Sequence, residues 1–398
     1  MAAWPIIRRA IGLALLLAAI PLLAFAQDTA GDAQAPRDGR SFLEGVLEDA
    51  LSAPGRRVQV IGFEGALSSR ATVETITFSD ADGTWLTIDE AELEWNRAAL
   101  LGGRLDVTTL KAASITLARP PRPAPPAPPD PQARAPFALP ELPVSVKIGE
   151  VSAGKVTLGK PVLGQRAVVT LKAALSLDGG AGRVNLSLRR TDGQEGALRL
   201  EAAYANDDRV LSLDMDAREA AGGIAASLLN LPGRPSVALG AQGTGPIDDY
   251  TAQVALATGG QERLSGTLRL GTGAAADAPG ADGAPAARTF AMDVNGDIAP
   301  LFAPDYRAFF GPDIALRVAG ARRDDGALTL ERLSLQARAM TLRGTARVAA
   351  DGWPEQLALT GRIAAPDGAP VLLPLAGPRT TIADGRVEIG FDAEKGDT

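Results

Sequence analysis

Two residue types that carry much of enzyme chemistry are missing from this sequence: its 398 residues include no histidine and no cysteine. Without histidine the chain lacks the commonest general base and the commonest transition-metal ligand. Without cysteine it can form neither disulfides nor thiolate metal sites, and no Ser–His or Cys–His pair can exist. We therefore expect no enzyme activity, no cofactor and no metal site.

Aromatic residues are also scarce, at 4%, so the 46% apolar content comes mainly from Ala, Val and Leu. Adjacent aspartates occur at 207–208, 248–249 and 324–325, but all three pairs fall in predicted turns, where charges are normally solvated. A two-carboxylate glycosidase stays open as an alternative, although the few aromatics disfavour a sugar-stacking cleft. The net charge of -7 argues against nucleic acid as a partner.

The N-terminal segment, residues 1–27, has the pattern of an export or membrane-insertion signal. Arg8 and Arg9 precede an apolar run from Ile11 to Ala26. Cleavage after a small-x-small pattern at 24–26 and retention as an inner-membrane anchor are both consistent with it, and either places the rest of the chain outside the cytoplasm. The predicted membrane segment contains Ile11, Leu15, Leu16, Leu17, Leu22 and Leu23.

The stretch from Arg166 to Ala217 alternates strictly between apolar and polar residues, interrupted by short turns at 178–182, 192–196 and 206–208. A period of two is typical of strands with one apolar and one polar face, and short loops join antiparallel neighbours. Similar runs elsewhere bring the total to roughly 20 strands. The expected fold is mostly β: a long curved antiparallel sheet that leaves an open groove, with a few short helices.

We expect six segments. After residues 1–27, residues 28–118 form a capping helix and a β-segment; 119–143 is a proline-rich linker or loop; 144–271 continues the sheet. Residues 272–288 form a flexible Ala/Gly/Pro loop. Residues 289–398 return to strands, with an aromatic helical plug near 298–312.

So long a sheet with so few helices leaves an apolar face uncovered, and an exposed apolar strip of that size should bind something long and apolar. An acyl chain or an unfolded β-strand would match. The residues expected to line the groove are Val169, Leu171, Leu175, Leu177, Val184, Leu186, Leu188, Leu198, Leu200, Leu211 and Leu213.

Two other β architectures fit less well. An outer-membrane barrel would need aromatic girdles, and proline-rich interruptions are hard to place between barrel strands. An adhesin or structural β-solenoid would show a fixed repeat period, and none is visible.

Several motifs in order carry a resemblance to a known family. They include Leu93 to Leu105 (LEWNRAALLGGRL), Leu228 to Pro235 (LLNLPGRP) and Gly243 to Tyr250 (GTGPIDDY). In these the chain resembles the N-terminal part of TamB, the translocation and assembly module subunit, within the AsmA-like, bridge-type lipid-transfer superfamily.

The resemblance implies a β-taco fold on a periplasmic protein anchored in the inner membrane. It also implies phospholipid acyl chains as cargo, a role in outer-membrane protein assembly, and a TamA-like outer-membrane partner. The family meets that partner through a C-terminal domain that is absent from this sequence. The family carries no catalytic residues, so none are transferred. A chaperone that uses a pairable sheet edge remains the main alternative function.

Overall fold

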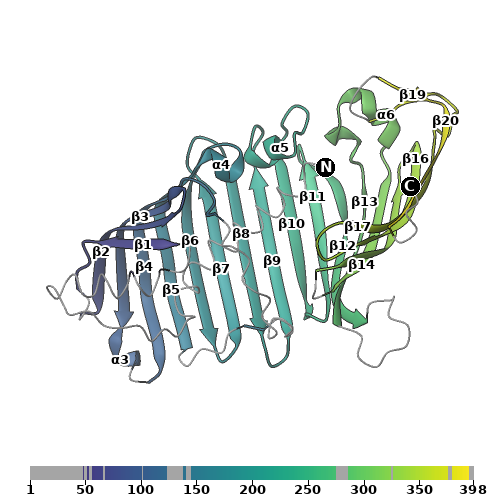
Figure 1. The fold of residues 1–398 in the computed structure, drawn as a ribbon. Coiled ribbons are helices and arrows are strands. Elements are labelled where there is room, and N and C mark those ends of the chain that lie inside the picture. Colours follow the sequence, from purple (N-terminus) through teal and green to yellow (C-terminus); the bar gives the residue numbers. More distant parts are fainter. Residues whose placement is uncertain are drawn as a thin grey trace. The chain divides into compact units, whose positions relative to one another are not determined.

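The structure, a computed structural model, describes residues 48, 52, 56–65, 68–100, 102–122, 138–139, 145–274, 286–323, 326–374 and 379–393. Strands account for 66% of the described residues, and helices are few and short. The expected fold class is confirmed, since the strands form an open β-sheet that does not close on itself (Figure 1). Contacts divide the chain into two compact units.

The first unit comprises Met1–Asp207 and Ala217–Leu229. Its strands pair in chain order, each with the next. They are β1 (Arg57–Ile61), β2 (Arg70–Asp80), β3 (Gly83–Asn96), β4 (Arg104–Leu117), β5 (Ser145–Leu158), β6 (Ala167–Asp178), β7 (Ala181–Arg190) and β8 (Gly196–Ala205). Its helices are α3 (Arg97–Leu100), α4 (Lys160–Leu163) and α5 (Ile224–Leu228).

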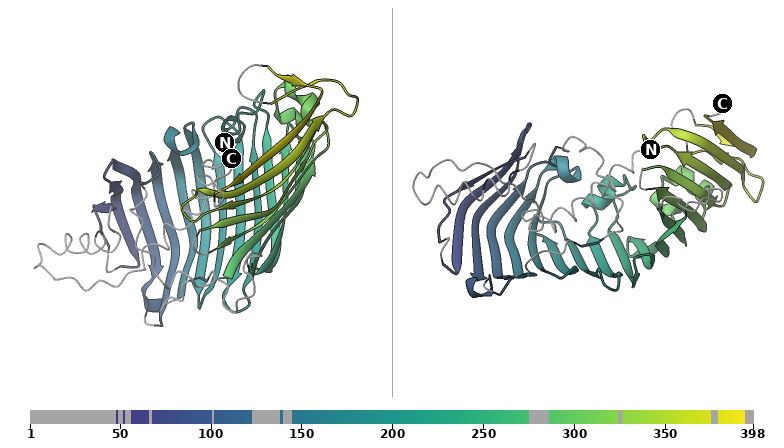
Figure 2. Two further views of the ribbon diagram at one scale, coloured as in Figure 1. Left: turned by 45° about the vertical axis from the view of Figure 1, so that its right-hand side comes forward. Right: turned by 60° about the horizontal axis from the view of Figure 1, so that its bottom comes forward.

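The second unit comprises Asp208–Asp216 and Asn230–Thr398, so that β9 (Val210–Glu219) straddles the division. Its sheet runs from β10 to β17 and ends on β20, which pairs with β17. In Figure 2 the strands from β13 onward, drawn in green to yellow, form a curved layer. The strands are β10 (Val237–Pro246), β11 (Asp249–Thr258), β12 (Gln261–Ala274), β13 (Ala286–Gly296), β14 (Ile314–Arg323), β15 (Leu328–Gln336), β16 (Met340–Val348), β17 (Pro354–Ala364) and β20 (Asp384–Asp392).

One pair of strands departs from the antiparallel expectation. β4 and β5 run parallel, with twelve residue pairs in register from Arg104 opposite Ser145 to Leu117 opposite Leu158. A parallel neighbour needs a long crossover, because the chain must return to the end where it started. The proline-rich stretch between the two strands provides that return.

Both described ends of this crossover are held by side chains of the first unit. At its start, Arg119 Nη1 donates to Asp80 Oδ2 at 2.9 Å, and the Arg122 backbone N–H donates to the same oxygen at 2.8 Å. At its far end, the Asn206 amide binds the backbone of Leu139. The crossover is therefore fixed at both of its described ends.

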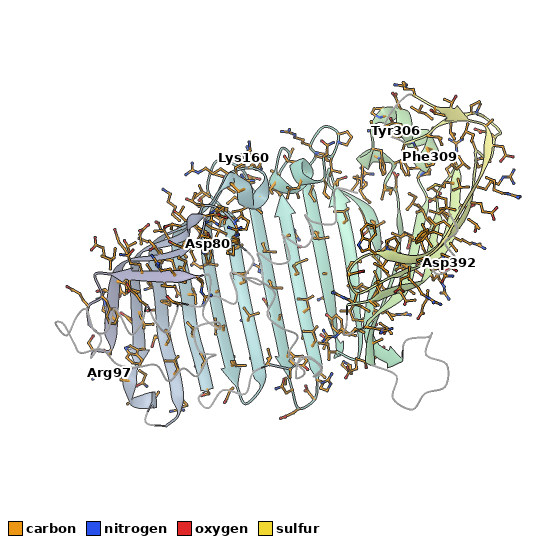
Figure 3. The ribbon with its side chains drawn as sticks, viewed as in Figure 1. Asp80, Arg97, Lys160, Tyr306, Phe309 and Asp392 are labelled. Atoms are coloured by element: carbon orange, nitrogen blue, oxygen red, sulfur yellow. The ribbon has the colours of Figure 1, made fainter. Side chains whose placement is uncertain are left out.

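The residues between β13 and β14 are built differently from the rest of the second unit. Two 3-10 turns, η2 (Ala299–Leu301) and η3 (Pro304–Tyr306), lead into α6 (Arg307–Phe310). Phe309 and Phe310 are buried there and pack against β18 (Val371–Leu372) of the small β18–β19 hairpin, whose second strand is Thr381–Ile382. Figure 3 shows Tyr306 and Phe309 gathered in this cluster.

Candidate functional site

Strand register gathers the apolar side chains of the first unit on one sheet face, called the apolar face below. Leu171 of β6 lies opposite Leu188 of β7, which lies opposite Leu198 of β8. Successive residues of a strand point to opposite faces, so the alternating polar side chains form the other, polar face. A parallel row on the apolar face consists of Val151, Ala173, Leu186 and Leu200.

All eleven residues predicted to line a groove lie in described strands. The nine in β6, β7 and β8 share the apolar face of the first unit by register. The other two, Leu211 and Leu213, flank Ser212 in β9; the Ser212 hydroxyl contacts Thr244 Oγ1 at 3.0 Å on the polar face, so the two leucines point to the opposite face. Those that are buried are Val169, Leu171, Leu175, Leu177 and Leu186. Those that are half-buried are Val184, Leu188, Leu198, Leu200, Leu211 and Leu213.

Both ends of the first unit's apolar face are covered by described segments. At one end Val162 and Leu163 of α4 and Ile224 of α5 pack on a cluster that includes Leu86, Leu117 and other core residues. At the other end Leu139 of the crossover and Trp95 pack near Val146 and Leu177. In the middle of the face, Leu188 of β7 and Leu198 and Leu200 of β8 are half-buried, whereas Leu186 is buried.

The second unit has an apolar face of the same kind. One row crosses six strands in register and consists of Met292, Val318, Leu333, Gly344, Leu359 and Ile389. The next row consists of Val294, Leu316, Leu335, Leu342, Gly361 and Val387. Apart from buried Val294, the side chains of these rows are half-exposed or, at Ile389, exposed. These rows are absent from the predicted set, although the same period of two was the signal that would have found them.

Glycines interrupt the apolar rows of the second unit where neighbouring backbones approach closely. A Cβ added at Gly344 would collide with the Ala358 carbonyl oxygen and with the side chain of Leu359. The same holds at Gly320, where the obstacles are the Thr329 carbonyl oxygen and the Phe290 ring. A glycine inside a strand marks such a close approach and permits a tight bend. The curvature of this layer therefore depends on positions without a side chain.

One charged group sits at the edge of the first unit's apolar face. The Arg190 side chain is only 7% exposed and forms ion pairs with Asp192 at 2.8 Å and Glu219 at 2.6 Å. The hydrogen bond with Asp192 raises the pKa of Arg190. Burial is the largest single influence on the pKa of Asp192 and raises it, but the hydrogen bonds from Arg190 and the Val168 N–H, together with the positive charge of Arg190, outweigh burial and leave that pKa lowered. Glu219 also accepts from the Ala225 N–H at 2.8 Å, so this network fixes α5 rather than performing chemistry.

Tyr250 is the largest polar side chain buried on the apolar face of the second unit. It is 2% exposed, its hydroxyl has no hydrogen-bond partner in the part of the chain that the structure describes, and burial raises its pKa. Gly243 and Tyr250 come close enough that a Cβ on the glycine would meet the tyrosine hydroxyl. The Tyr250 side chain therefore packs close to the backbone of Gly243, which has no side chain.

Within the described ranges, no group of three or more acidic side chains is arranged to hold a metal ion. In the same ranges, no helix has the length and apolar character needed to span a membrane. The predicted membrane segment, including Ile11 and Leu23, lies outside the described residues.

A family model described as intermembrane phospholipid transport protein YdbH matches residues 39–389. The chain belongs to the YdbH-like family. No curated protein and no solved structure matches it.

Membership of the YdbH-like family supports the bridge-type lipid-transfer superfamily expected from the sequence, but not TamB in particular. The YdbH-like match covers both units, so the apolar rows of β6–β8 and of β13–β20 fall inside it. The family is one of lipid carriers and not a known class of enzyme, in keeping with a site made of aliphatic side chains.

Proposed function

We propose that this chain carries phospholipid between the inner and outer membranes, with the acyl chains lying on the apolar faces and the headgroup in water. The observation that carries the proposal is the set of apolar rows that pass from strand to strand in register, such as Leu171–Leu188–Leu198. The match to a family named for intermembrane phospholipid transport supports it.

The physical basis is the loss of apolar surface to water. Each methylene group removed from water contributes about 0.8 kcal/mol, and the attraction has no preferred direction. An acyl chain can therefore move along a row of aliphatic side chains with little change in energy. Half-exposed residues such as Leu200 and Leu359 are the ones a chain can reach, since Leu171 and Leu186 are already buried by their neighbours.

Site-specific photocrosslinking tests the proposal on both faces of the same strands. A photoreactive amino acid at Leu200 of β8 or Leu359 of β17 should form adducts with phospholipid acyl chains in cells. The matched controls are the next residues, Glu201 and Thr360, which point to the polar face. Mass spectrometry of the purified adducts identifies the lipid. Equal labelling at 200 and 201, or at 359 and 360, would refute acyl-chain binding to the apolar face.

A second candidate function is the assembly role expected from the TamB resemblance, in which a client strand of an outer-membrane protein pairs with a sheet edge. The observation that favours it is β20, which pairs only with β17 among the described strands and leaves one edge open. An open edge presents unpaired N–H and C=O groups to an incoming strand. A TamA-like outer-membrane protein would then be the partner.

The two functions give different crosslinks. A photoreactive residue at Arg386 in β20 should capture outer-membrane protein if the edge receives client strands. Labelling of protein there, with no lipid adduct at Leu200 or Leu359, would favour assembly over lipid transport.

The proposed location is the periplasm, with the N-terminal apolar segment from Ile11 to Ala26 either holding the body at the inner membrane or cleaved after export. Membrane fractionation combined with N-terminal sequencing separates these outcomes. A mature N-terminus near Gln27 in the soluble periplasmic fraction would rule out the anchor.

A further inference from the structure

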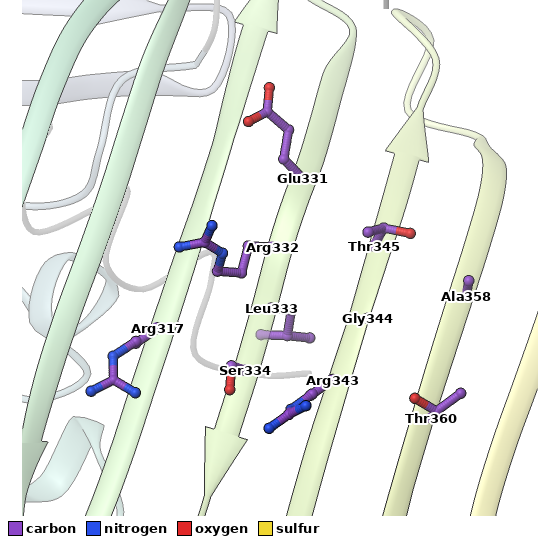
Figure 4. A pocket seen from close by; sticks show the side chains of 10 residues that line it. All are labelled: Arg317, Glu331, Arg332, Leu333, Ser334, Arg343, Gly344, Thr345, Ala358 and Thr360. Carbon is purple, nitrogen blue, oxygen red and sulfur yellow. The ribbon is translucent and has the colours of Figure 1, made fainter. Parts of the chain in front are cut away.

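The polar face of the second unit contains a hollow of about 530 Å³ lined by three arginines. Arg317 of β14 lies opposite Ser334 of β15, Ser334 lies opposite Arg343 of β16, and Arg332 lies two residues before Ser334 on the same face. Figure 4 shows the three guanidinium groups on adjacent strands. The hollow thus lies on the face opposite the apolar rows.

A bulge in β15 shapes this site. The register shifts between Leu330 and Leu333, and both intervening residues, Glu331 and Arg332, are exposed. A bulge of this kind redirects side chains that a regular strand would place on alternate faces. Small side chains on the facing strands, such as Ala358, leave the space open.

Two of the three arginines have no ionic partner among the described residues. Arg317 Nε binds Asp293 Oδ2 at 3.0 Å, whereas Arg332 and Arg343 form no ion pair or hydrogen bond with any described residue. Elsewhere in this unit Arg338, Arg362 and Arg379 are each paired with an aspartate. In a chain of net charge -7, two guanidinium groups without a partner in the described ranges form a local positive site, and Glu331 is the one acidic residue that lines the hollow.

The geometry points to a phosphoryl-binding site formed by Arg332 and Arg343, with the hydroxyls of Ser334, Thr345 and Thr360 at its floor. A guanidinium group presents paired N–H donors that match the oxygens of a phosphate, and such charge-assisted bonds are about twice as strong as neutral ones. Hydroxyls supply the remaining donors. The ligand is a phosphate group, whether free or carried by a lipid headgroup.

This inference does not depend on lipid binding to the apolar face, because the two sites lie on opposite sides of the sheet. A phospholipid whose tails rest on Leu359 cannot reach Arg343 through the strands. A phosphate bound at the hollow would therefore belong to a different molecule, or to a membrane surface facing the polar side.

Inorganic phosphate titrated into the full chain, followed by calorimetry at low ionic strength, tests the site. Arg332→Gln and Arg343→Gln should each weaken phosphate binding by about tenfold, whereas Glu331→Gln should tighten it by removing a repulsive charge. The matched control is Arg269→Gln, which removes an exposed arginine from the polar face of β12, outside the hollow. Circular dichroism checks that each variant is folded.

Vesicles distinguish the source of the phosphate. Flotation with phosphatidylglycerol vesicles that is lost in Arg343→Gln and reduced by free phosphate would assign a lipid headgroup. Phosphate binding without flotation would assign a free phosphate. The inference is overturned if phosphate does not bind, if Arg269→Gln weakens binding as much as Arg343→Gln, or if a polyglutamate peptide binds more tightly than phosphate.

Discussion

Asn206 holds Leu139 through both polar groups of the leucine backbone. The Leu139 N–H donates to Asn206 Oδ1 at 2.8 Å, and Asn206 Nδ2 donates to the Leu139 carbonyl oxygen at 2.9 Å. The Leu139 side chain then packs on the cluster around Val146 and Leu177. One amide side chain therefore positions the end of the crossover against the apolar face.

Replacing this amide should loosen the crossover. Asn206→Ala removes two hydrogen bonds, each worth about 1 kcal/mol, so we expect the first unit to lose about 2 kcal/mol of unfolding free energy in urea. Asn185→Ala, on the polar face of β7, is the matched control and should change little. Equal losses in the two variants would show that the contact with Leu139 does not matter.

Low pH should weaken the other attachment of the crossover. The hydrogen bond from Arg119 holds the pKa of Asp80 well below its usual range, with help from the Arg122 N–H. Because this folded-state pKa is depressed, the unfolded state binds the proton first. The stabilisation is therefore complete above the ordinary aspartate pKa of about 3.9 and is lost progressively as the pH falls below it.

Urea unfolding between pH 6 and pH 3 measures this effect. The wild type should be more stable than Asp80→Asn at pH 6, and the difference should shrink toward pH 3. Asp82→Asn is the control, since the ion pair of Asp82 with Arg122 is well exposed and spans 3.3 Å. A difference between wild type and Asp80→Asn that is independent of pH would contradict the assignment.

The aromatic cluster at the end of the second unit should be a large contributor to its stability. Phe309 is 2% exposed, and its ring meets that of Phe310 edge to face at 5.2 Å. Phe309→Ala should cost about 3–5 kcal/mol, by lost burial and the cavity left behind. Trp353→Ala serves as control because Trp353 is 73% exposed, and it should stay within about 0.5 kcal/mol. Thermal unfolding of the two variants compares them directly.

A side chain at Gly344 should strain the curved layer. Gly344→Ala places a methyl group against the Ala358 carbonyl oxygen and the Leu359 side chain, so we expect a loss of about 1–3 kcal/mol. Gly390→Ala on β20 is the matched control, because a Cβ there meets nothing within 4 Å. Similar unfolding midpoints for the two variants would show that the strands can relax around the added group.

Much of this fold follows from the alternation of apolar and polar residues. The strands from β6 to β9 lie where the pattern between Arg166 and Ala217 predicts them, because short turns leave few other pairings. Elsewhere the pattern misleads: β3 reads as two strands, since Glu90 adopts a positive φ of 50° in its middle and breaks the alternation. The parallel β4–β5 pair could not be predicted, because the crossover carries no signal for the direction of return.

The apolar face and the arginine hollow also differ in how far the sequence predicts them. The predicted aliphatic residues of β6–β8 share one face because a period of two fixes the face of every residue in a regular strand. The arginine hollow was not predictable. It depends on the register of β14 with β15 and β16 and on the bulge at Glu331 and Arg332, and sequence alone specifies neither.

The parallel strands β4 and β5 are hydrogen-bonded neighbours although no short turn joins them. Their twelve registered pairs join two strands that no tight turn connects, whereas a tight hairpin turn would dictate both register and spacing; the cost of closing a longer connection grows only slowly with its length. The connection between them is therefore the place to splice a reporter domain into this molecule, between Arg122 and Ala138. Two separately expressed fragments, one ending after β4 and the other beginning before β5, should associate by pairing these two strands.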